Sequence, residues 1–208
     1  ALTVGAEIDP EVAEAVRDVA RLCESLGHHV EEASLPGDHS AMQAAARTVL
    51  WASVAANVDA EAERRGRPLA DGELEAPTLD VYRRGKQTYA PDYVRAVQTI
   101  HAYGRAAASL FERYDVFLLA TLGRPAILIG WLFEDPTKTV ERLFAYMPNT
   151  QAFNNSGQPA MSVPLAWSSG GLPIGIQFAA RMGDEATLFR LAGQLEKARP
   201  WFDRTAPL

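Results

Sequence analysis

Two adjacent serines followed by two glycines, Ser168-Ser169-Gly170-Gly171, are the residues whose types and spacing suggest covalent chemistry. A serine hydroxyl attacks a carbonyl carbon efficiently only when a nearby base takes its proton, and fixed donors must then stabilise the oxyanion. Ala166 and Trp167 precede the serines, and the run separates two β-patterned segments. Because Ser and Gly are also common turn residues, we interpret this run as a hairpin turn and not as a nucleophile.

The histidines and the single cysteine form no pattern that favours a metal or a catalytic dyad. His28 and His29 are the one adjacent pair among four histidines. They alternate across a predicted strand, so one faces inward and one outward, and no Asp or Ser is spaced to partner them. Cys23 lies on the apolar stripe of a predicted helix, which favours a core position. Since no Cys/His cluster has zinc spacing, we expect neither a metal nor a cofactor.

Large apolar side chains in the second half of the chain could line a substrate pocket, although residues of this kind also build ordinary cores. Asn154 allows two interpretations: its amide either orients the backbone of a pocket or ties the loop before a strand. The apolar candidates are Trp51, Trp131, Phe133, Tyr146 and Met147. The predicted substrate-pocket residues are therefore Trp131, Tyr146, Met147 and Asn154.

The composition is that of a globular protein with a substantial core, since 48% of the residues are hydrophobic. Twenty Lys and Arg against 26 Asp and Glu give a net charge of -6, and these charges are scattered. Scattered charges disfavour nucleic acid and anionic membranes as partners. No apolar run approaches the ~20 residues of a spanning helix, and no leader is apparent. With one cysteine, we expect a reducing compartment, the cytoplasm.

Residues 1–34 predict a β-α-β unit. The chain opens on a strand-like run at 1–5 without an initiator Met, which suggests a piece of a longer protein. Asp9 and Pro10 then supply an N-cap and a first-turn proline, and a helical stripe continues until Gly27. A second strand is expected at 29–33. Such a unit normally implies parallel pairing, so we expect an α/β fold whose mixed β-sheet is covered by helices.

The remainder predicts a helical segment at 40–114 followed by strands and a final helix at 115–208. The helical segment contains three helices, over 40–66, 79–89 and 91–114, with a loop at 69–77. The apolar run at 115–121 is short enough for a buried strand, and an extended loop follows it. Runs at 162–167 and 174–180 predict a hairpin, and Asp184 begins a helix that ends before Pro200.

The order of motifs in the second half resembles the carboxy-terminal part of the amidase signature family. The matching segments are Tyr114-Asp115-Val116, Phe153-Asn154-x-Ser156-Gly157-x-Pro159-Ala160-x-Ser162-Val163-Pro164-Leu165, Gly171-Leu172-Pro173-Ile174-Gly175-Ile176-Gln177-Phe178 and Gly183-Asp184-Glu185-Ala186-Thr187-Leu188. The β-α-β unit resembles the one that follows the catalytic core in that family. The resemblance thus spans nearly the whole chain and implies that the sheet is incomplete without an amino-terminal part.

The resemblance implies hydrolysis of a carboxamide C–N bond by a serine, a bridging cis-serine and a lysine, without metal or cofactor. These groups lie upstream of the matching segments, and none of Lys86, Lys138 and Lys197 accompanies a suitable Ser/Gly loop. We therefore predict no catalytic residue in this chain, inactivity of the chain alone, and a missing amino-terminal catalytic half as its partner. The isolated chain, with sheet edges unpaired, is expected to self-associate or to be marginally stable.

Within the family, the chain looks more like amidases that cleave linear or cyclic aminoalkanoate amides. In amidotransferase members an acidic residue that holds the substrate amine falls near Met147, so an apolar residue there disfavours glutamine hydrolysis. A small, not strongly charged amide is the expected substrate. The strand after Asp115 ends in Ala120-Thr121 where the family usually has Pro-Thr, which alters the loop that borders the pocket.

Two alternatives remain open on the sequence. The chain could be a non-catalytic binding or interaction module that kept the half-fold. It could also be a self-sufficient hydrolase that uses Ser168 or Ser169.

Overall fold

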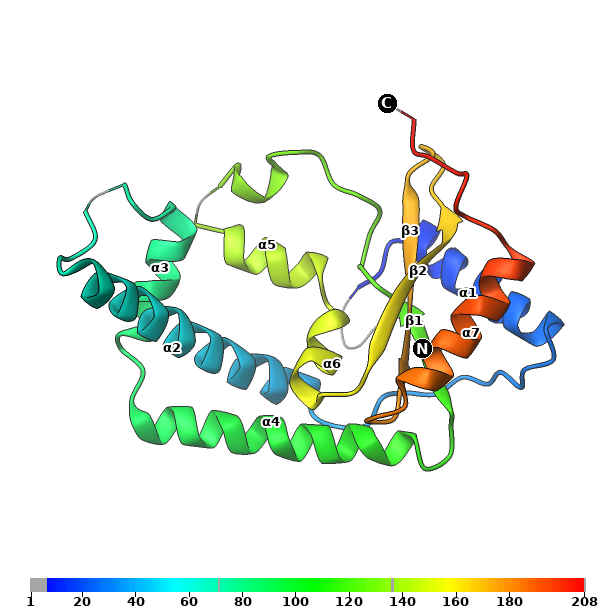
Figure 1. Ribbon diagram of the computed structural model, residues 1–208, viewed down its shortest axis with the longest axis horizontal. Helices are drawn as coiled ribbons and strands as arrows, with labels where there is room; N and C mark the ends of the chain where they lie inside the picture. Colours follow the sequence, from blue (N-terminus) through cyan, green and yellow to red (C-terminus); the bar gives the residue numbers. More distant parts are fainter. Residues whose placement is uncertain (1–6, 71, 136, 208) are drawn as a thin grey trace.

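The computed structural model describes residues 7–70, 72–135 and 137–207, which form helices around a small sheet (Figure 1). In chain order the elements are α1 (Pro10–Ser25), α2 (His39–Arg65), α3 (Ala76–Gly85), α4 (Ala90–Leu110), β1 (Val116–Ala120), the 3-10 helix η1 (Trp131–Phe133), α5 (Thr139–Tyr146), α6 (Thr150–Ser156), β2 (Ala160–Trp167), β3 (Pro173–Ala180) and α7 (Glu185–Ala198). The strand expected at 1–5 lies outside the described residues.

The three described strands form one antiparallel sheet in the order β1-β3-β2, with β3 in the centre. Strands β2 and β3 are the hairpin predicted from the sequence. In the register of this sheet, Gln177 of β3 lies between Leu119 of β1 and Ser162 of β2. The parallel partner that would make the sheet mixed was expected from 1–5, outside the described residues, and the three described strands are all antiparallel.

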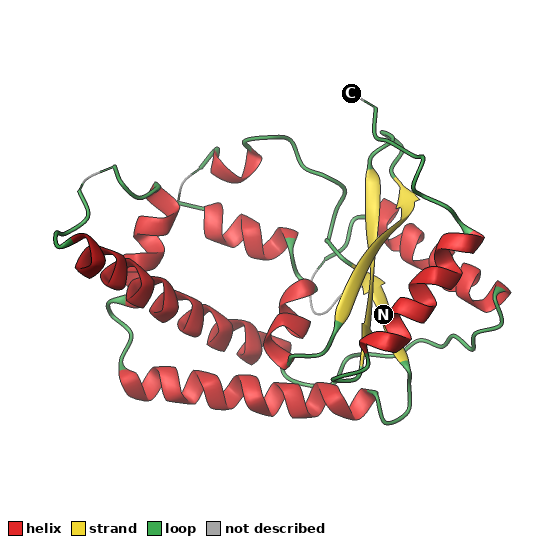
Figure 2. Ribbon diagram, in the orientation of Figure 1, coloured by secondary structure: helices red, strands yellow, loops and turns green. Residues whose placement is uncertain are grey.

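Helices cover both faces of the sheet, as an α/β fold requires (Figure 2). Helices α1 and α7 pack on one face, and α2, α4 and α6 lie on the other. Successive side chains of a strand point to opposite faces, and this alternation divides β3 between two cores. Ile174, Ile176 and Phe178 belong to the core under α1 and α7, whereas Ala179 joins the core under α2, α4 and α6.

A helical arm formed by α2, α3 and α4 extends away from the sheet (Figure 1). Helix α2 begins at an Asp38 cap, whose Oδ1 accepts from the backbone N–H of Ala41 at 2.9 Å, and ends at Gly66 with φ +67°. Helix α3 approaches α2 closely at the buried Gly85, where a Cβ atom would lie 2.0 Å from the carbonyl oxygen of Trp51. Packing without a side chain at Gly85 therefore holds the arm together.

Helix α1 confirms two predictions made from the sequence. Its N-cap is Asp9, whose Oδ1 accepts a hydrogen bond from the backbone N–H of Glu11 at 2.8 Å, and Pro10 occupies the first turn. Cys23 lies in the core, where burial raises the pKa of its thiol. Cys23 is buried because it belongs to the apolar stripe of α1, and this stripe packs on the sheet.

The strand expected at 29–33 does not form, because residues 28–36 have no ladder partner in the described sheet. Side chains hold this extended segment instead: Glu31 accepts hydrogen bonds from Tyr114 and, at 2.7 Å, from Arg113. Leu35 is buried beneath the arm side of the sheet. The prediction of a strand at 29–33 is therefore wrong for the described sheet.

Two short helices, α5 and α6, were absent from the sequence prediction. Residue Asn154 was expected in a loop before a strand, but it lies in α6 with an exposed side chain. Helix α6 ends at Gly157, which has φ +81°, and this left-handed glycine turns the chain toward β2. The segment that precedes β2 is thus a helix that ends at a glycine cap, and Asn154 lies inside it.

Candidate functional site

The loop after β1 is held in place by hydrogen bonds at its beginning. The Nδ2 of Asn149, which is 0% exposed, donates to the carbonyl oxygen of Ala120 at 2.7 Å. The backbone N–H of Thr121 donates to the carbonyl of Gly175 at 3.0 Å, and that of Gly123 donates to the carbonyl of Tyr146 at 3.1 Å. Three elements, β1, β3 and α5, therefore meet where this loop begins.

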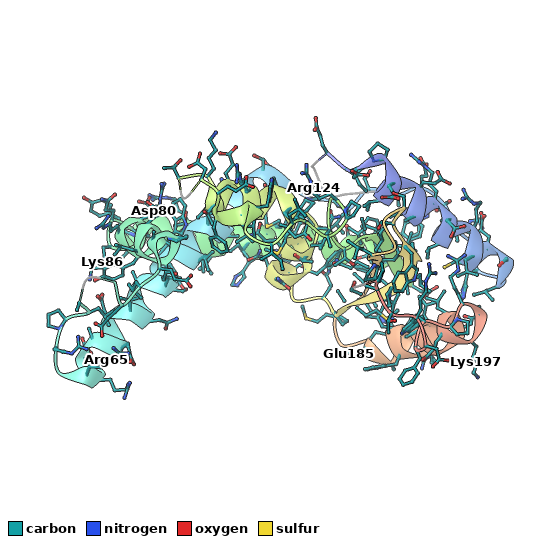
Figure 3. The ribbon with its side chains drawn as sticks, turned by 90° about the horizontal axis from the view of Figure 1, so that it is seen from above. Arg65, Asp80, Lys86, Arg124, Glu185 and Lys197 are labelled. Atoms are coloured by element: carbon teal, nitrogen blue, oxygen red, sulfur yellow. The ribbon has the colours of Figure 1, made fainter. Side chains whose placement is uncertain are left out.

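A cavity of about 60 Å³ opens between the loop, α5 and the start of β3. It is lined by Leu122, Arg124, Pro125, Ala126, Tyr146, Pro173, Ile174 and Gly175. Most of the lining is apolar, and Arg124 and Tyr146 supply the polar groups. Figure 3 shows Arg124 in the middle of the molecule, between the arm that carries Arg65 and the helix that carries Lys197.

Trp131 contacts two guanidinium groups, one of which belongs to the cavity lining. The Cζ atom of Arg124 is 5.6 Å from the centre of the Trp131 ring, and that of Arg142 is 5.0 Å from it. Arg142 also donates a hydrogen bond to the carbonyl oxygen of Trp131 and lies 3.4 Å from a carboxylate oxygen of Glu134. Cation–π contacts of this kind fix the indole ring and, through Arg124, connect it to the cavity.

Two of the four predicted pocket residues are associated with this cavity. Tyr146 lines it, and Trp131 contacts Arg124, which lines it. Met147 ends α5, with its backbone N–H bonded to the carbonyl of Leu143, and Asn154 lies further along in α6; neither lines the cavity. Apolar side chains of the loop project outward next to it, since Leu128 is 84% exposed and Phe133 is 58% exposed.

Two hydroxyl groups meet across the central strand beside the cavity. The Oγ1 of Thr121, just after β1, and the Oγ of Ser162 in β2 are 2.6 Å apart. Gly175 of β3 passes between them, and a Cβ atom there would lie 2.7 Å from Ser162 Oγ and 3.0 Å from Thr121 Oγ1. The absence of a side chain at Gly175 is therefore what allows the two hydroxyls to bond.

The sequence contained a signal for this contact that was not used. A glycine inside a β-patterned run marks a bulge or a close approach, and Gly175 stands between two isoleucines. Arg124, Asn149 and Gln177 were also missed. Their positions depend on which loop and which helix come together, and neighbours in the chain do not reveal this.

The run of two serines and two glycines forms the turn of the hairpin, as predicted. The backbone N–H of Gly171 donates to the carbonyl of Ser168 at 2.8 Å, and Gly171 has φ +75°. The Oγ of Ser168 accepts from the backbone N–H of Leu172 at 3.0 Å, and the backbone N–H of Ser169 donates to Glu11. The Ser168 hydroxyl thus closes the turn locally, which is the role of a turn residue.

Two histidines form contacts away from the cavity. His28 Nε2 lies 2.7 Å from Gln194 Oε1, and His39 Nδ1 lies 3.0 Å from the Tyr103 hydroxyl. Burial lowers the pKa of His39. Among the described residues, no three His, Cys, Asp or Glu side chains gather in a way that could hold a metal ion. Within the same residues, no helix is long and apolar enough to cross a membrane.

Comparison with known proteins identifies relatives along almost the whole chain. The chain is 32% identical over 212 residues to the 6-aminohexanoate-cyclic-dimer hydrolase of Paenarthrobacter ureafaciens, with 97% of this chain and 43% of the relative covered. It is 33% identical over 211 residues to the putative amidase AmiC of Mycobacterium leprae, with 96% and 42% covered. The chain therefore spans less than half the length of these curated relatives.

Solved structures share the fold. A structure of 6-aminohexanoate cyclic dimer hydrolase with substrate superposes with a TM-score of 0.87 at 32% identity, covering 96% of this chain and 43% of that one. A bacterial aryl acylamidase of the amidase signature family superposes with a TM-score of 0.77 over 100% of this chain and 45% of that one; at 20% identity this likeness shows the fold alone. The amidase family model matches residues 2–189. The chain belongs to the amidase family.

Proposed function

We propose that these 208 residues are one part of an amidase that hydrolyses the carboxamide C–N bond of a small, not strongly charged amide. The serine, cis-serine and lysine lie in the part that this chain does not contain, and no cofactor takes part. One observation carries the proposal: the chain matches its relatives along 97% of its own length but only 43% of theirs. Membership of a hydrolytic family and the length missing relative to the relatives together support an active site formed by this chain and the absent part.

In this proposal the chain contributes a wall of the substrate site and no nucleophile. The cavity with Tyr146, the fixed Trp131 ring and the exposed apolar side chains of the loop support it, because small-molecule sites are mostly apolar with few polar groups. Met147 and Asn154 complete the wall when the absent part is present. The apolar side chain of Met147 suits a neutral amide substrate better than it suits glutamine as a substrate.

The proposed compartment is the cytoplasm, from the reducing environment that a single buried cysteine suits.

Hydrolysis of 6-aminohexanoate cyclic dimer, the neutral diamide named for the relatives, tests the function. The longest polypeptide encoded around these residues is expected to release amine at neutral pH without added metal, and the 208 residues alone are expected to release none. Within the longer polypeptide, Trp131→Ala should raise KM more than it lowers kcat, because it removes binding surface and not a reacting group. Trp201→Ala, on the opposite face of the sheet, is the control.

A second candidate function is a binding module that kept the half-fold without catalysis. Its support is the Ser168 hydroxyl, which serves the turn and leaves no activated nucleophile there. The intact mass and start site of the native gene product distinguish the two candidates. A start immediately before these residues favours the binding module, and a longer product with a Gly-Gly-Ser-Ser-Gly-Gly loop and a lysine favours the amidase.

A further inference from the structure

Gln177 carries a buried amide whose N–H donors lack an acceptor. The residue is 3% exposed in the central strand β3, and its Nε2 atom has no hydrogen-bond partner among the described residues. Buried polar groups are nearly always paired, because an unpaired donor loses its water without compensation.

A second buried glutamine, Gln158, has a hydrogen-bond partner for its side-chain amide within the chain. Gln158 is 5% exposed, and its Oε1 accepts a hydrogen bond from the Oγ of Ser156. The two glutamines are alike in type and burial, and they differ in that the described residues supply a partner for Gln158 Oε1 and none for Gln177 Nε2. The contrast makes Gln158 a matched control for Gln177.

Gln177 lies at the boundary between the covered and the open part of one sheet face. Paired residues of neighbouring strands point to the same face, so Leu119, Gln177 and Ser162 share it. Leu119 is fully buried under the arm-side helices, whereas Ser162 is exposed, and so is Ala160 two residues earlier in β2. The helices of the described chain therefore cover β1 and β3 on this face and leave β2 open.

The hydroxyl pair beside Gln177 adds a donor at the same place. Thr121 Oγ1 and Ser162 Oγ share one hydrogen at 2.6 Å, so the hydroxyl that accepts keeps its own hydrogen for another acceptor. The open part of the sheet face thus presents two neutral donor groups, the amide of Gln177 and one hydroxyl of the Thr121–Ser162 pair. A neutral carbonyl oxygen satisfies such donors without burying a charge.

We propose that the Gln177 amide donates a hydrogen bond to a backbone carbonyl of the absent amino-terminal half, which covers β2 on this face. Gln177 is then a positioning residue that fixes a segment of that half against the sheet. The inference rests on the proposed function, because it needs the second half. It assigns a task to a residue that touches neither substrate nor the reacting atoms.

The test compares Gln177→Met and Gln158→Met in the 208-residue chain and in the longer polypeptide. Met keeps the length of the side chain and removes its donors and acceptors. In the 208-residue chain, Gln177→Met should leave the unfolding midpoint unchanged or raise it, and Gln158→Met should lower it. In the longer polypeptide, Gln177→Met should raise the unfolding equilibrium constant about tenfold against the wild type, the size of one hydrogen bond.

A third variant, Gln177→Glu, provides a readout that loss of packing alone would not change. A protonated carboxyl can donate to the same carbonyl, and an ionised one cannot. In the longer polypeptide, the Gln177→Glu defect should therefore diminish as pH falls from 8 toward 5 and should become smaller than the Gln177→Met defect once the carboxyl is protonated. Burial of the ionised carboxylate explains the pH dependence by itself, so the comparison with Gln177→Met at low pH is the readout of the donated hydrogen bond.

Each outcome decides the proposal. Equal stability of wild-type and Gln177→Met longer polypeptides overturns it, and so does destabilisation of the 208-residue chain by Gln177→Met as large as that by Gln158→Met. If the 208-residue chain does not unfold cooperatively, the longer polypeptide decides alone. Failure of the proposed function is a separate result: an inactive wild-type longer polypeptide contradicts the amidase assignment whatever the stability data give.

Discussion

At the residue scale, the contact of Thr121 and Ser162 across Gly175 is the feature that most constrains the sequence near the cavity. Two strands deliver hydroxyls to one point, and the strand between them must carry no side chain there. The glycine is required for space and not for backbone conformation, because it has no positive φ. This makes the requirement testable by adding a single methyl group.

We predict that Gly175→Ala lowers the stability of the protein by about 1–3 kcal/mol, because the new methyl group displaces a hydroxyl in a tight contact. The measurement is the unfolding midpoint in urea. Gly193→Ala is the matched control: Gly193 lies inside α7 with no atom within 4 Å of an added Cβ, so alanine there should stabilise by about 0.5–1 kcal/mol. Equal effects of the two substitutions would contradict the packing at Gly175.

Asn149 should matter for stability far more than Asn154. Asn149→Ala removes the donor to the Ala120 carbonyl at a fully buried position and is expected to cost about 1–3 kcal/mol. Asn154→Ala changes an exposed side chain of α6 and is expected to stay within about 0.5 kcal/mol. Thermal unfolding of the two variants checks the order, and a larger loss for Asn154→Ala would show that the anchoring of the loop is misassigned.

Individual residues were predictable from the sequence where a local pattern decides their place. Asp9 caps a helix because a proline and an amphipathic stripe follow it, and the Ser/Gly run turns because strands flank it. Tyr146, which lines the cavity, and Trp131, which contacts Arg124, were singled out by their size and hydrophobicity, and their part in a substrate pocket stays a prediction. Asn149, Arg124 and Gln177 were not found, because their importance arises from contacts between residues far apart in the chain.

At the element scale, the helical arm depends on charged contacts at the end of α2. Glu73 receives hydrogen bonds from Arg67 and from the backbone N–H of Ala70, and these contacts lower the pKa of Glu73 from its usual 4.5 to about 2. Figure 3 shows this end of the arm, where Arg65 is labelled. The loop after α2 is therefore fixed by one carboxylate.

Acid should loosen this loop in a defined window. Because folding lowers the pKa of Glu73, the stability that the contacts supply is complete above about pH 4.5 and is lost as pH falls toward 2. Glu73→Gln should make the loop sensitive to proteolysis already at pH 7 and should flatten the fall in stability between pH 4.5 and 2. Glu63→Gln, on the exposed surface of α2, should do neither. An unchanged pH profile for Glu73→Gln would contradict the assignment.

Long helices and the hairpin were predictable because apolar periodicity over many residues specifies an element without knowledge of its partner. The strand at 29–33 was wrong for the converse reason: a strand needs a neighbour, and the described sheet provides none for this segment. Helices α5 and α6 are too short for periodicity to reveal them.

At the scale of the whole molecule, the chain carries surface that suits a partner. Leu128 and Ile129 are exposed next to the cavity, and among the described strands β2 has a neighbour on one edge only. Exposed apolar groups and a free strand edge promote association between copies.

We therefore predict that the isolated chain self-associates, with an apparent mass that rises with concentration in sedimentation equilibrium. Ile129→Lys should reduce the association. Phe189→Lys replaces another exposed apolar side chain, on α7 and on the opposite face of the sheet, and should leave the association unchanged. A stable monomer at every concentration would mean that these surfaces need no partner.

The central claim is that this chain is part of an amidase whose nucleophile lies elsewhere in the polypeptide. The most direct measurement is fluorophosphonate labelling of the longest polypeptide encoded around these residues, with the adduct located by peptide mapping. We predict a single serine adduct outside the 208 residues. An adduct on Ser168 or Ser169, or no serine adduct at all, would contradict the account.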